Sequence, residues 1–126
     1  MTEKFSLKKK FSLITGASGL LGYEHSHALL EIQSNLILTD IDMNQLTINK
    51  KKLQKKFPNS KILAFKMDVT NERSIKSVIT KIKKDRINLN VLINNAAIDS
   101  KVLKSNKMTN TGKLENLSIE IWNKHL

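Results

Sequence analysis

A glycine-rich turn stands between an apolar stretch and a helical pattern near the start of the chain. It reads Thr-Gly-Ala-Ser-Gly-Leu-Leu-Gly over residues 15–22, directly after the apolar residues 11–14. Glycine allows φ angles above zero, and a turn without side chains lets a phosphate group approach the backbone amides. The segment therefore predicts a phosphate-binding turn between a strand and a helix. The alternative is a turn with a purely structural role.

A carboxylate stands where a second part of the same ligand would lie. Asp40 ends the second apolar stretch and comes 24 residues after Gly16. At this place an acidic side chain can accept hydrogen bonds from both ribose hydroxyls of an adenosine. A carboxylate repels a 2′-phosphate, and neither Ser18 nor Ile41 supplies a compensating cation, so we expect NAD in preference to NADP. Asp42 competes for this role, and a solvated strand-end carboxylate is the other alternative.

Strand and helix patterns alternate along the chain. Apolar stretches predict strands over residues 11–15, 35–39, 61–69 and 90–97. A first helix follows the glycine turn, a second spans residues 43–57 before Pro58, and a third follows the third strand. The apolar face predicted for the first helix consists of Leu21, His25, Ala28, Leu29 and Ile32. The face predicted for the third consists of Ile75, Val78, Ile79 and Ile82.

Strands that are joined by helices run parallel, and right-handed crossovers then produce a doubly wound α/β sheet. We expect a Rossmann-like fold with strand order 3-2-1-4, whose ligand crevice lies at the carboxyl ends of the strands. The glycine turn, Asp40, Asp68 and Asn94 all follow strands at that edge. The sheet is expected to be incomplete, because strand 4 would be left as an unpaired edge. The chain alone should therefore be marginally stable or self-associating.

The composition narrows the class of protein. The chain has 126 residues, so residues 1–126 are predicted to form a single domain. No apolar run approaches the ~18 residues of a membrane span, and the absence of cysteine excludes disulfides and thiolate metal sites. His25 and His27 point to different faces of a helix, so no metal site is predicted. We expect a cytoplasmic protein without a membrane partner.

The net charge of +11 raises the question of a nucleic-acid partner. The positive charge is nearly all lysine, and Arg73 and Arg86 are the only arginines. Base and phosphate recognition relies on the arginine fork and on aromatic stacking, and aromatic residues are few here. Solvated surfaces account for the lysine blocks, so no nucleic-acid partner is expected. The polar segment 99–116 is either a substrate mouth or disordered.

From about Lys8 onward the chain resembles the first half of the short-chain dehydrogenase/reductase family. The turn at 15–22 resembles the family's cofactor motif, Asp68-Val69 its adenine-binding pair, and Asn94-Asn95-Ala96-Ala97 its Asn-Asn-Ala-Gly element. The resemblance implies an oxidoreductase that transfers hydride between nicotinamide and an alcohol or ketone. The cofactor-binding residues that it implies are Thr15, Gly16, Ser18, Gly19, Leu20, Gly22, Asp40, Ile41, Asp68, Val69, Asn94, Asn95, Ala96 and Ala97.

The glycine spacing departs from the standard-length branch of that family. Leu20 occupies the place of the second glycine, and Gly19 comes one residue early, as in the extended branch that acts on nucleotide sugars. The Asn-Asn-Ala element and Asp68-Val69-Thr70 belong to the standard-length branch, which we favour. Ala97 replaces the last glycine of the element, a small change. A sugar or nucleotide-sugar substrate is the narrower expectation that the spacing implies.

The family's catalytic Ser, Tyr and Lys have no counterpart in the sequence. Tyr23, the one tyrosine, lies in the first predicted helix and has His27 rather than Lys four positions later. No catalytic residue is therefore predicted, and we expect an N-terminal piece of a longer, homo-oligomeric enzyme that is inactive by itself. The residues from Leu117 on resemble the start of the family's next helix. A non-catalytic dinucleotide-binding module is the alternative.

Overall fold

The structure is a computed structural model that describes residues 5–97. The helices and strands described lie in Met1–Asn95, the first of two units into which the chain divides. In chain order they are β1 (Phe11–Thr15), α1 (Leu20–Glu31), β2 (Asn35–Asp40), α2 (Met43–Lys56), β3 (Ile62–Lys66), α3 (Glu72–Lys84) and β4 (Leu89–Ile93). The strands form one parallel sheet in the order β3-β2-β1-β4, which confirms the predicted fold and strand order.

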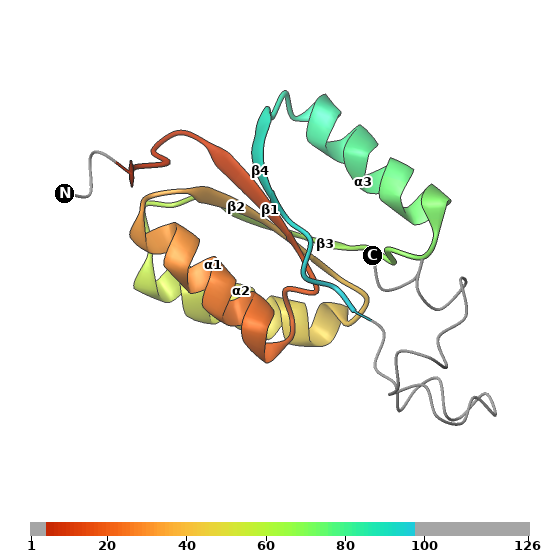
Figure 1. Cartoon of the computed structure of the whole chain (residues 1–126), viewed down its shortest axis with the longest axis horizontal. Helices are drawn as coiled ribbons and strands as arrows, with labels where there is room; N and C mark the ends of the chain where they lie inside the picture. The colour runs from red at the N-terminus through yellow and green to blue at the C-terminus, as the bar shows by residue number, and fades with distance from the viewer. Residues whose placement is uncertain (1–4, 98–126) are drawn as a thin grey trace, which may run out of the picture. The chain divides into compact units, whose positions relative to one another are not determined.

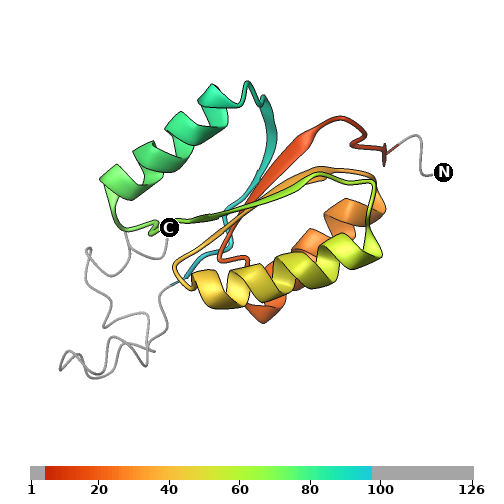
Figure 2. The ribbon, with the colours of Figure 1, turned by 180° about the vertical axis from the view of Figure 1, so that it is seen from behind.

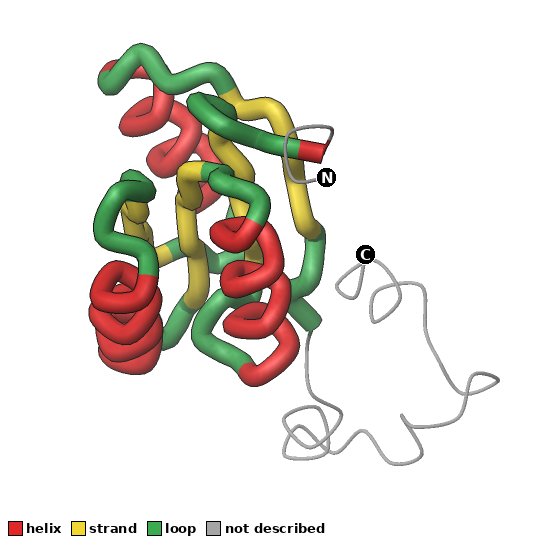
Figure 3. The backbone as a smooth tube through the Cα atoms, turned by 90° about the vertical axis from the view of Figure 1, so that its left-hand side faces the viewer, coloured by secondary structure: helices red, strands yellow, loops and turns green. Residues whose placement is uncertain are grey.

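The helices lie on both faces of the sheet. Helices α1 and α2 cover one face and α3 the other (Figure 1), and the view from behind shows the same arrangement (Figure 2). Each helix runs antiparallel to the strand before it, so the loops gather at two opposite edges of the sheet (Figure 3). We call the edge where strands end the strand-end edge, and the other the strand-start edge.

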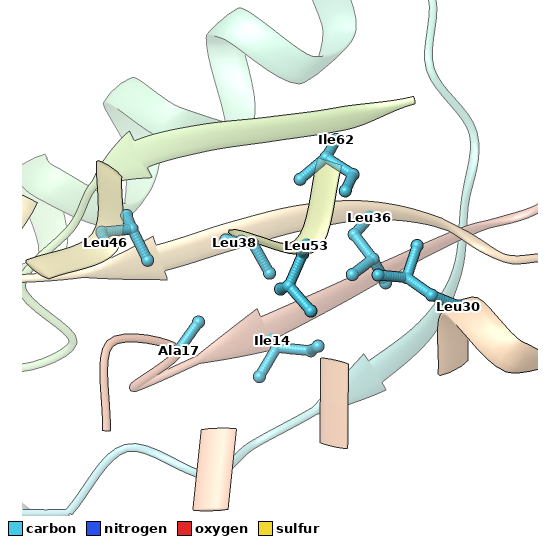
Figure 4. Close-up of a cluster of buried hydrophobic side chains, with 8 residues drawn as sticks. All are labelled: Ile14, Ala17, Leu30, Leu36, Leu38, Leu46, Leu53 and Ile62. Carbon is cyan, nitrogen blue, oxygen red and sulfur yellow. The ribbon is translucent and has the colours of Figure 1, made fainter. Parts of the chain in front are cut away.

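The main core fills the space between the sheet and helices α1 and α2 (Figure 4). Ile14, Leu36 and Leu38 point from the sheet toward this face, and Leu46 and Leu53 of α2 pack on them. All five side chains are fully buried. This packing fixes the ends of β1 and β2, and hence the turn and the carboxylate that follow them.

The predicted apolar face of α1 is wrong in large part, although Leu29 packs against the main core and Ile32 is half-buried. Leu21 is 65% exposed, and His25 and Ala28 are exposed as well. The residues that α1 buries are instead small or aliphatic: Gly22, Ser26 and Leu30. Small side chains let the helix approach the turn before it, and the Ser26 hydroxyl donates to the carbonyl of Gly22 within the buried face. A search for large apolar residues at helical spacing overlooks such a face.

Helix α3 behaves largely as its periodicity predicts. Val78 and Ile82 are buried against Leu13 and Ile37 on the opposite face of the sheet. Ile75 is partly buried in the same cluster, whereas Ile79 is 43% exposed. The third and fourth strands are shorter than predicted. The expected segment 99–116 and the helix near Leu117 lie outside the described residues. No helix in the described part is long and apolar enough to cross a membrane.

Candidate functional site

The glycine turn joins β1 to α1 at the strand-end edge, and two of its glycines are required by its own geometry. Gly16 has φ of 65°, a conformation that side chains disfavour. A Cβ on Gly22 would collide with the carbonyl oxygen of Gly16 and lie 2.7 Å from the Cα of Ala17. At Gly19, by contrast, a Cβ would meet only the Gly16 oxygen, in ordinary contact at 3.6 Å. Internal packing therefore does not require glycine at 19, which is the N-cap of α1.

The N-terminus of α1 differs from those of the other two helices described. Asp42 caps α2 by accepting from Gln45 N–H, and Asn71 caps α3 by accepting from Arg73 and Ser74 N–H. Helix α1 has Gly19 as its N-cap, no side-chain cap and no acidic residue in its first turn. Its exposed N–H groups and the positive end of its dipole can therefore receive an anion.

Asp40 binds directly to the glycine turn. Its Oδ2 accepts a hydrogen bond from Ser18 N–H at 3.0 Å, and its Oδ1 accepts one from Asp42 N–H at 3.0 Å. The side chain of Asp42 is engaged as the cap of α2. Asp40 is half-buried and lies against the turn, so the geometry favours it over Asp42 as the carboxylate that faces a ligand at the turn.

Asn49 contacts the glycine turn from helix α2, and this role was not predicted from the sequence. This side chain of α2 is 5% exposed and donates through Nδ2 to the carbonyl oxygens of Ala17 and Ser18, each at 3.1 Å. Gln45 Nε2 donates in turn to Asn49 Oδ1 at 2.9 Å. The signal was present in the sequence, because Asn49 interrupts the apolar stripe on which the buried residues of α2 lie.

The ends of β1 and β4 are joined by side chains. Thr15 Oγ1 donates to Asn94 Oδ1 at 3.3 Å and accepts from Asn95 N–H at 3.0 Å. The Asn95 amide donates to the carbonyl oxygen of Gly16 at 3.2 Å. The structure thus brings together the predicted residues of the glycine turn and of the Asn-Asn element. Ala96 and Ala97 follow in the chain and are the last residues described.

Asp68 follows β3 at the same edge. Its Oδ1 accepts from both the hydroxyl and the N–H of Thr70, at 2.7 and 2.9 Å. These two hydrogen bonds, first that of the hydroxyl, lower the pKa of the Asp68 carboxyl below its usual value. Its other oxygen accepts no hydrogen bond from residues 5–97. Val69 beside it is half-buried in the second core cluster, on the α3 face.

Two predicted site residues expose large apolar surfaces at this edge. Leu20 is 81% exposed at the first position of α1, and Ile41 is 57% exposed between β2 and α2. Beside the turn, a hollow of about 610 Å³ lies between α1 and α2. Ser18 and Gly19 line one part of it, and the cations that line it are Lys52, Lys55 and Lys56, which were expected only as part of a solvated surface. The described residues contain no group of three or more acidic or histidine side chains that could hold a metal ion.

Comparison with known proteins identifies the family. The model of the short chain dehydrogenases matches residues 10–125, and the chain belongs to that family. It is 33% identical over 97 residues to the short chain dehydrogenase/reductase dpfgG of Gibberella zeae, covering 77% of this chain and 35% of that protein. The chain spans about a third of the length of the curated relatives it matches.

Solved structures agree on the fold. A protein assigned as a D-mannonate oxidoreductase from Haemophilus influenza, with bound NAD, is 26% identical with a TM-score of 0.69, over 78% of this chain and 34% of that one. An NADPH-dependent 3-quinuclidinone reductase from Rhodotorula rubra is also 26% identical, with a TM-score of 0.65, over 72% of this chain and 34% of that one. One of these neighbours binds NAD and the other depends on NADPH, so the likeness extends to nicotinamide dinucleotides as a class.

Proposed function

We propose that the strand-end edge is the dinucleotide site of an NAD-dependent oxidoreductase that interconverts an alcohol and a ketone. The observation that carries the proposal is the uncapped N-terminus of α1 beside Gly19, a glycine that internal packing does not require. A pyrophosphate fits such a terminus, because backbone N–H groups and the helix dipole both favour an anion. The bound nicotinamide would supply hydride transfer.

Different residues of the chain would bind different parts of that cofactor. The uncapped N–H groups in the first turn of α1 would receive the pyrophosphate, because the N–H groups of Ser18 and Gly19 already donate to Asp40 and to the carbonyl of Gly16. The carboxylates of Asp40 and Asp68 would accept from the ribose and from the adenine. Asn49 would act as a positioning residue, since it fixes the carbonyls of Ala17 and Ser18 and so orients the amides that follow. Thr15 and Asn95 would hold the ends of β1 and β4 in register beside the nicotinamide half.

The preference for NAD over NADP rests on Asp40. A carboxylate that already lies 3.0 Å from Ser18 N–H would meet a 2′-phosphate with like charge. We expect NAD to bind about tenfold more tightly than NADP, the ratio that about 1.4 kcal/mol produces. Lys52, in the hollow next to Ser18, is the cation that could offset this repulsion, so Lys52→Gln should widen the ratio if the lysine reaches the phosphate.

Calorimetric titration of the chain with NAD and NADP tests the proposal. Asp40→Asn should weaken NAD binding and narrow the preference over NADP, whereas Asp42→Asn, which keeps a good helix cap, should leave both unchanged. Equal effects of the two variants would overturn the role of Asp40. Absence of any NAD binding by the wild-type chain would overturn the site itself.

The substrate is proposed more broadly than the cofactor. The family supports an alcohol/ketone pair, and the early position of Gly19 keeps a sugar or nucleotide sugar as the narrower proposal. A dinucleotide-binding module without catalysis is the competing function, because Tyr23 is half-buried against the core and no Lys lies four residues after it. Because the chain by itself is expected to be inactive, the test belongs to the full-length protein: a Ser and a Tyr-x-x-x-Lys encoded downstream, with turnover of NAD on secondary alcohols or sugars, would favour the enzyme. Tight NAD binding by the full-length protein without turnover would favour the module.

A further inference from the structure

The strand-start edge carries a hollow that the proposed function does not use. It measures about 520 Å³, which is the size of a small-molecule site, and we call it the strand-start hollow. Loops before β1, β3 and β4 line it, and Asp85 is its one lining carboxylate. The cations that line it are Lys8, Lys9, Lys10, Lys61 and Arg86.

Helix dipoles explain other lysines near this edge, and Arg86 at the end of α3, but not Lys8, Lys9, Lys10 and Lys61. The last turns of α2 and α3 are rich in lysine, where positive charge stabilises the carbonyl end of a helix. The cations of the hollow belong to loops, and none of them forms an ion pair in the part of the chain described. Like charges gathered without carboxylate partners repel each other, and a bound anion would relieve that repulsion.

Two asparagines leave hydrogen-bond donors at the hollow. Asn35 Oδ1 accepts from Lys61 N–H at 2.8 Å, and Asn90 Oδ1 accepts from Phe11 N–H at 3.1 Å. A backbone N–H can only donate, so each side-chain oxygen must face the backbone and each NH₂ group must face away from it. Neither Nδ2 has a hydrogen-bond partner among residues 5–97, and both asparagines line the hollow.

The position of Asn90 depends on an irregularity in the sheet. The pairing of β1 with β4 shifts between Phe11 and Ser12, which face Leu89 and Val91, so Asn90 has no partner residue on β1. Such a bulge re-aims a side chain. Here the bulge allows Asn90 Oδ1, in place of a backbone carbonyl, to accept from Phe11 N–H. The NH₂ group of Asn90 then lies at the strand-start edge.

Arg86 occupies a place where glycine is the usual residue. It follows the C-cap of α3 with φ of 55°, and Gln33 stands at the matching place after α1 with φ of 73°. A residue with a side chain is disfavoured in this conformation. Arg86 lines the strand-start hollow and Gln33 does not, so the two positions compare the same backbone conformation with and without a charge at the hollow. Gln33 also accepts a hydrogen bond from the Ser6 hydroxyl, which in turn accepts from Lys8 N–H.

We propose that the strand-start hollow binds a small soluble compound with clustered phosphate groups, such as a di- or triphosphate. Phosphate oxygens accept from lysine, arginine and amide donors together, and the hollow offers all three. A nucleic acid fits less well, because Arg86 is the single arginine at the hollow and its one lining aromatic, Phe11, is half-buried. The site is independent of a dinucleotide at the strand-end edge.

Titration of the ¹⁵N-labelled chain with sodium tripolyphosphate, in the presence of saturating NAD, tests the proposal. The side-chain NH₂ signals of Asn35 and Asn90 should shift, and the backbone amide signals of Ser18 and Gly19 should not. Shifts confined to Ser18 and Gly19, or no shift at all, would overturn the proposal. If a short DNA duplex binds more tightly than tripolyphosphate and shifts the signals of Asn35 and Asn90, the ligand of the hollow is a nucleic acid and not a small phosphate compound.

Two matched variants complete the test. Arg86→Gly should weaken tripolyphosphate binding about fivefold, since one charge-assisted contact is lost. Gln33→Gly should leave that binding unchanged, while both variants should raise Tm by a few degrees, about 4 °C. An equal loss of binding in Lys51→Gln, whose exposed lysine on α2 lies outside the hollow, would reduce the effect to general charge and overturn the proposal.

Discussion

The two edges of the sheet are built by different means, although parallel strands bring loops together at both. At the strand-end edge the donors are backbone amides, which Asp40 and Asn49 fix through hydrogen bonds to the glycine turn. At the strand-start edge the donors are the side chains of lysine, Arg86 and two asparagines. Backbone donors are fixed before a ligand arrives, whereas lysine side chains must be ordered on binding.

This difference predicts different kinds of recognition. A preorganised turn of backbone amides discriminates by shape, because it cannot adjust to a ligand of another geometry. Exposed side-chain charges accept many phosphate arrangements and lose strength as salt screens them, over a length of about 8 Å at physiological ionic strength. Substitutions at the strand-end edge should therefore act mainly on stability and shape, and those at the strand-start edge mainly on charge.

The largest expected effect separates two glycines of the same turn. Gly22→Ala should lower the free energy of unfolding by about 3 kcal/mol, because the new Cβ collides with the backbone at Gly16. Gly19→Ala should cost only about 0.5 kcal/mol, the scale of a change at a helix N-cap, while weakening NAD binding. Urea unfolding measures both. Similar losses of stability in the two variants would mean that Gly19 also has a packing role.

A second pair compares amides at the two edges. Asn49→Ala should destabilise the chain by about 2 kcal/mol, because two turn carbonyls lose their buried donor. Asn90→Ala should cost less, about 0.5 kcal/mol, since water can replace the acceptor of Phe11 N–H at this exposed position. Asn44→Ala, at an exposed position of α2, is the control and should change stability little. Equal losses in the free energy of unfolding for the Asn49 and Asn90 variants would contradict the difference between the two edges.

A gain in stability is expected at the strand-start edge. Lys9 has φ of 66°, so Lys9→Gly should raise the free energy of unfolding by about 1 kcal/mol. Lys10→Gly removes the same charge at a residue without positive φ, and it should bring no such gain because glycine adds freedom to the unfolded chain. If both variants stabilise equally, relief of charge repulsion rather than backbone conformation is responsible.

The smallest effect concerns pH. The hydrogen bonds of Thr70 hold the pKa of Asp68 below its usual value, so ionised Asp68 stabilises the fold above the unfolded-state pKa of 3.8. That contribution is lost as the pH falls through the lower folded-state pKa. Thr70→Val should raise the Asp68 pKa and remove part of this acid-side dependence, as an NMR titration of the carboxyl carbon would show. An unchanged pKa in the variant would contradict the assigned cause.

The sequence allows prediction of whatever depends on local pattern. The strands β1 and β2, the strand order and the position of Asp40 at a strand end follow from apolar stretches and from the handedness of crossovers. The buried face of α1 was missed because Gly22 and Ser26 bury little apolar surface. The polar residue at 49 in the apolar stripe of α2 marks a special position, but its partners in the glycine turn are distant in the chain and do not follow from that pattern. The bulge at Asn90 likewise depends on the pairing with β1.

The central claim is that the strand-end edge, and not the strand-start edge, receives the dinucleotide. Titration of the ¹⁵N-labelled chain with NAD, followed through backbone amide signals, tests it most directly. We expect saturable shifts at Ser18, Gly19 and Leu20, with the signals of Lys10 and Asn90 unmoved. Shifts at Lys10 and Asn90 without a response at the glycine turn would contradict the account.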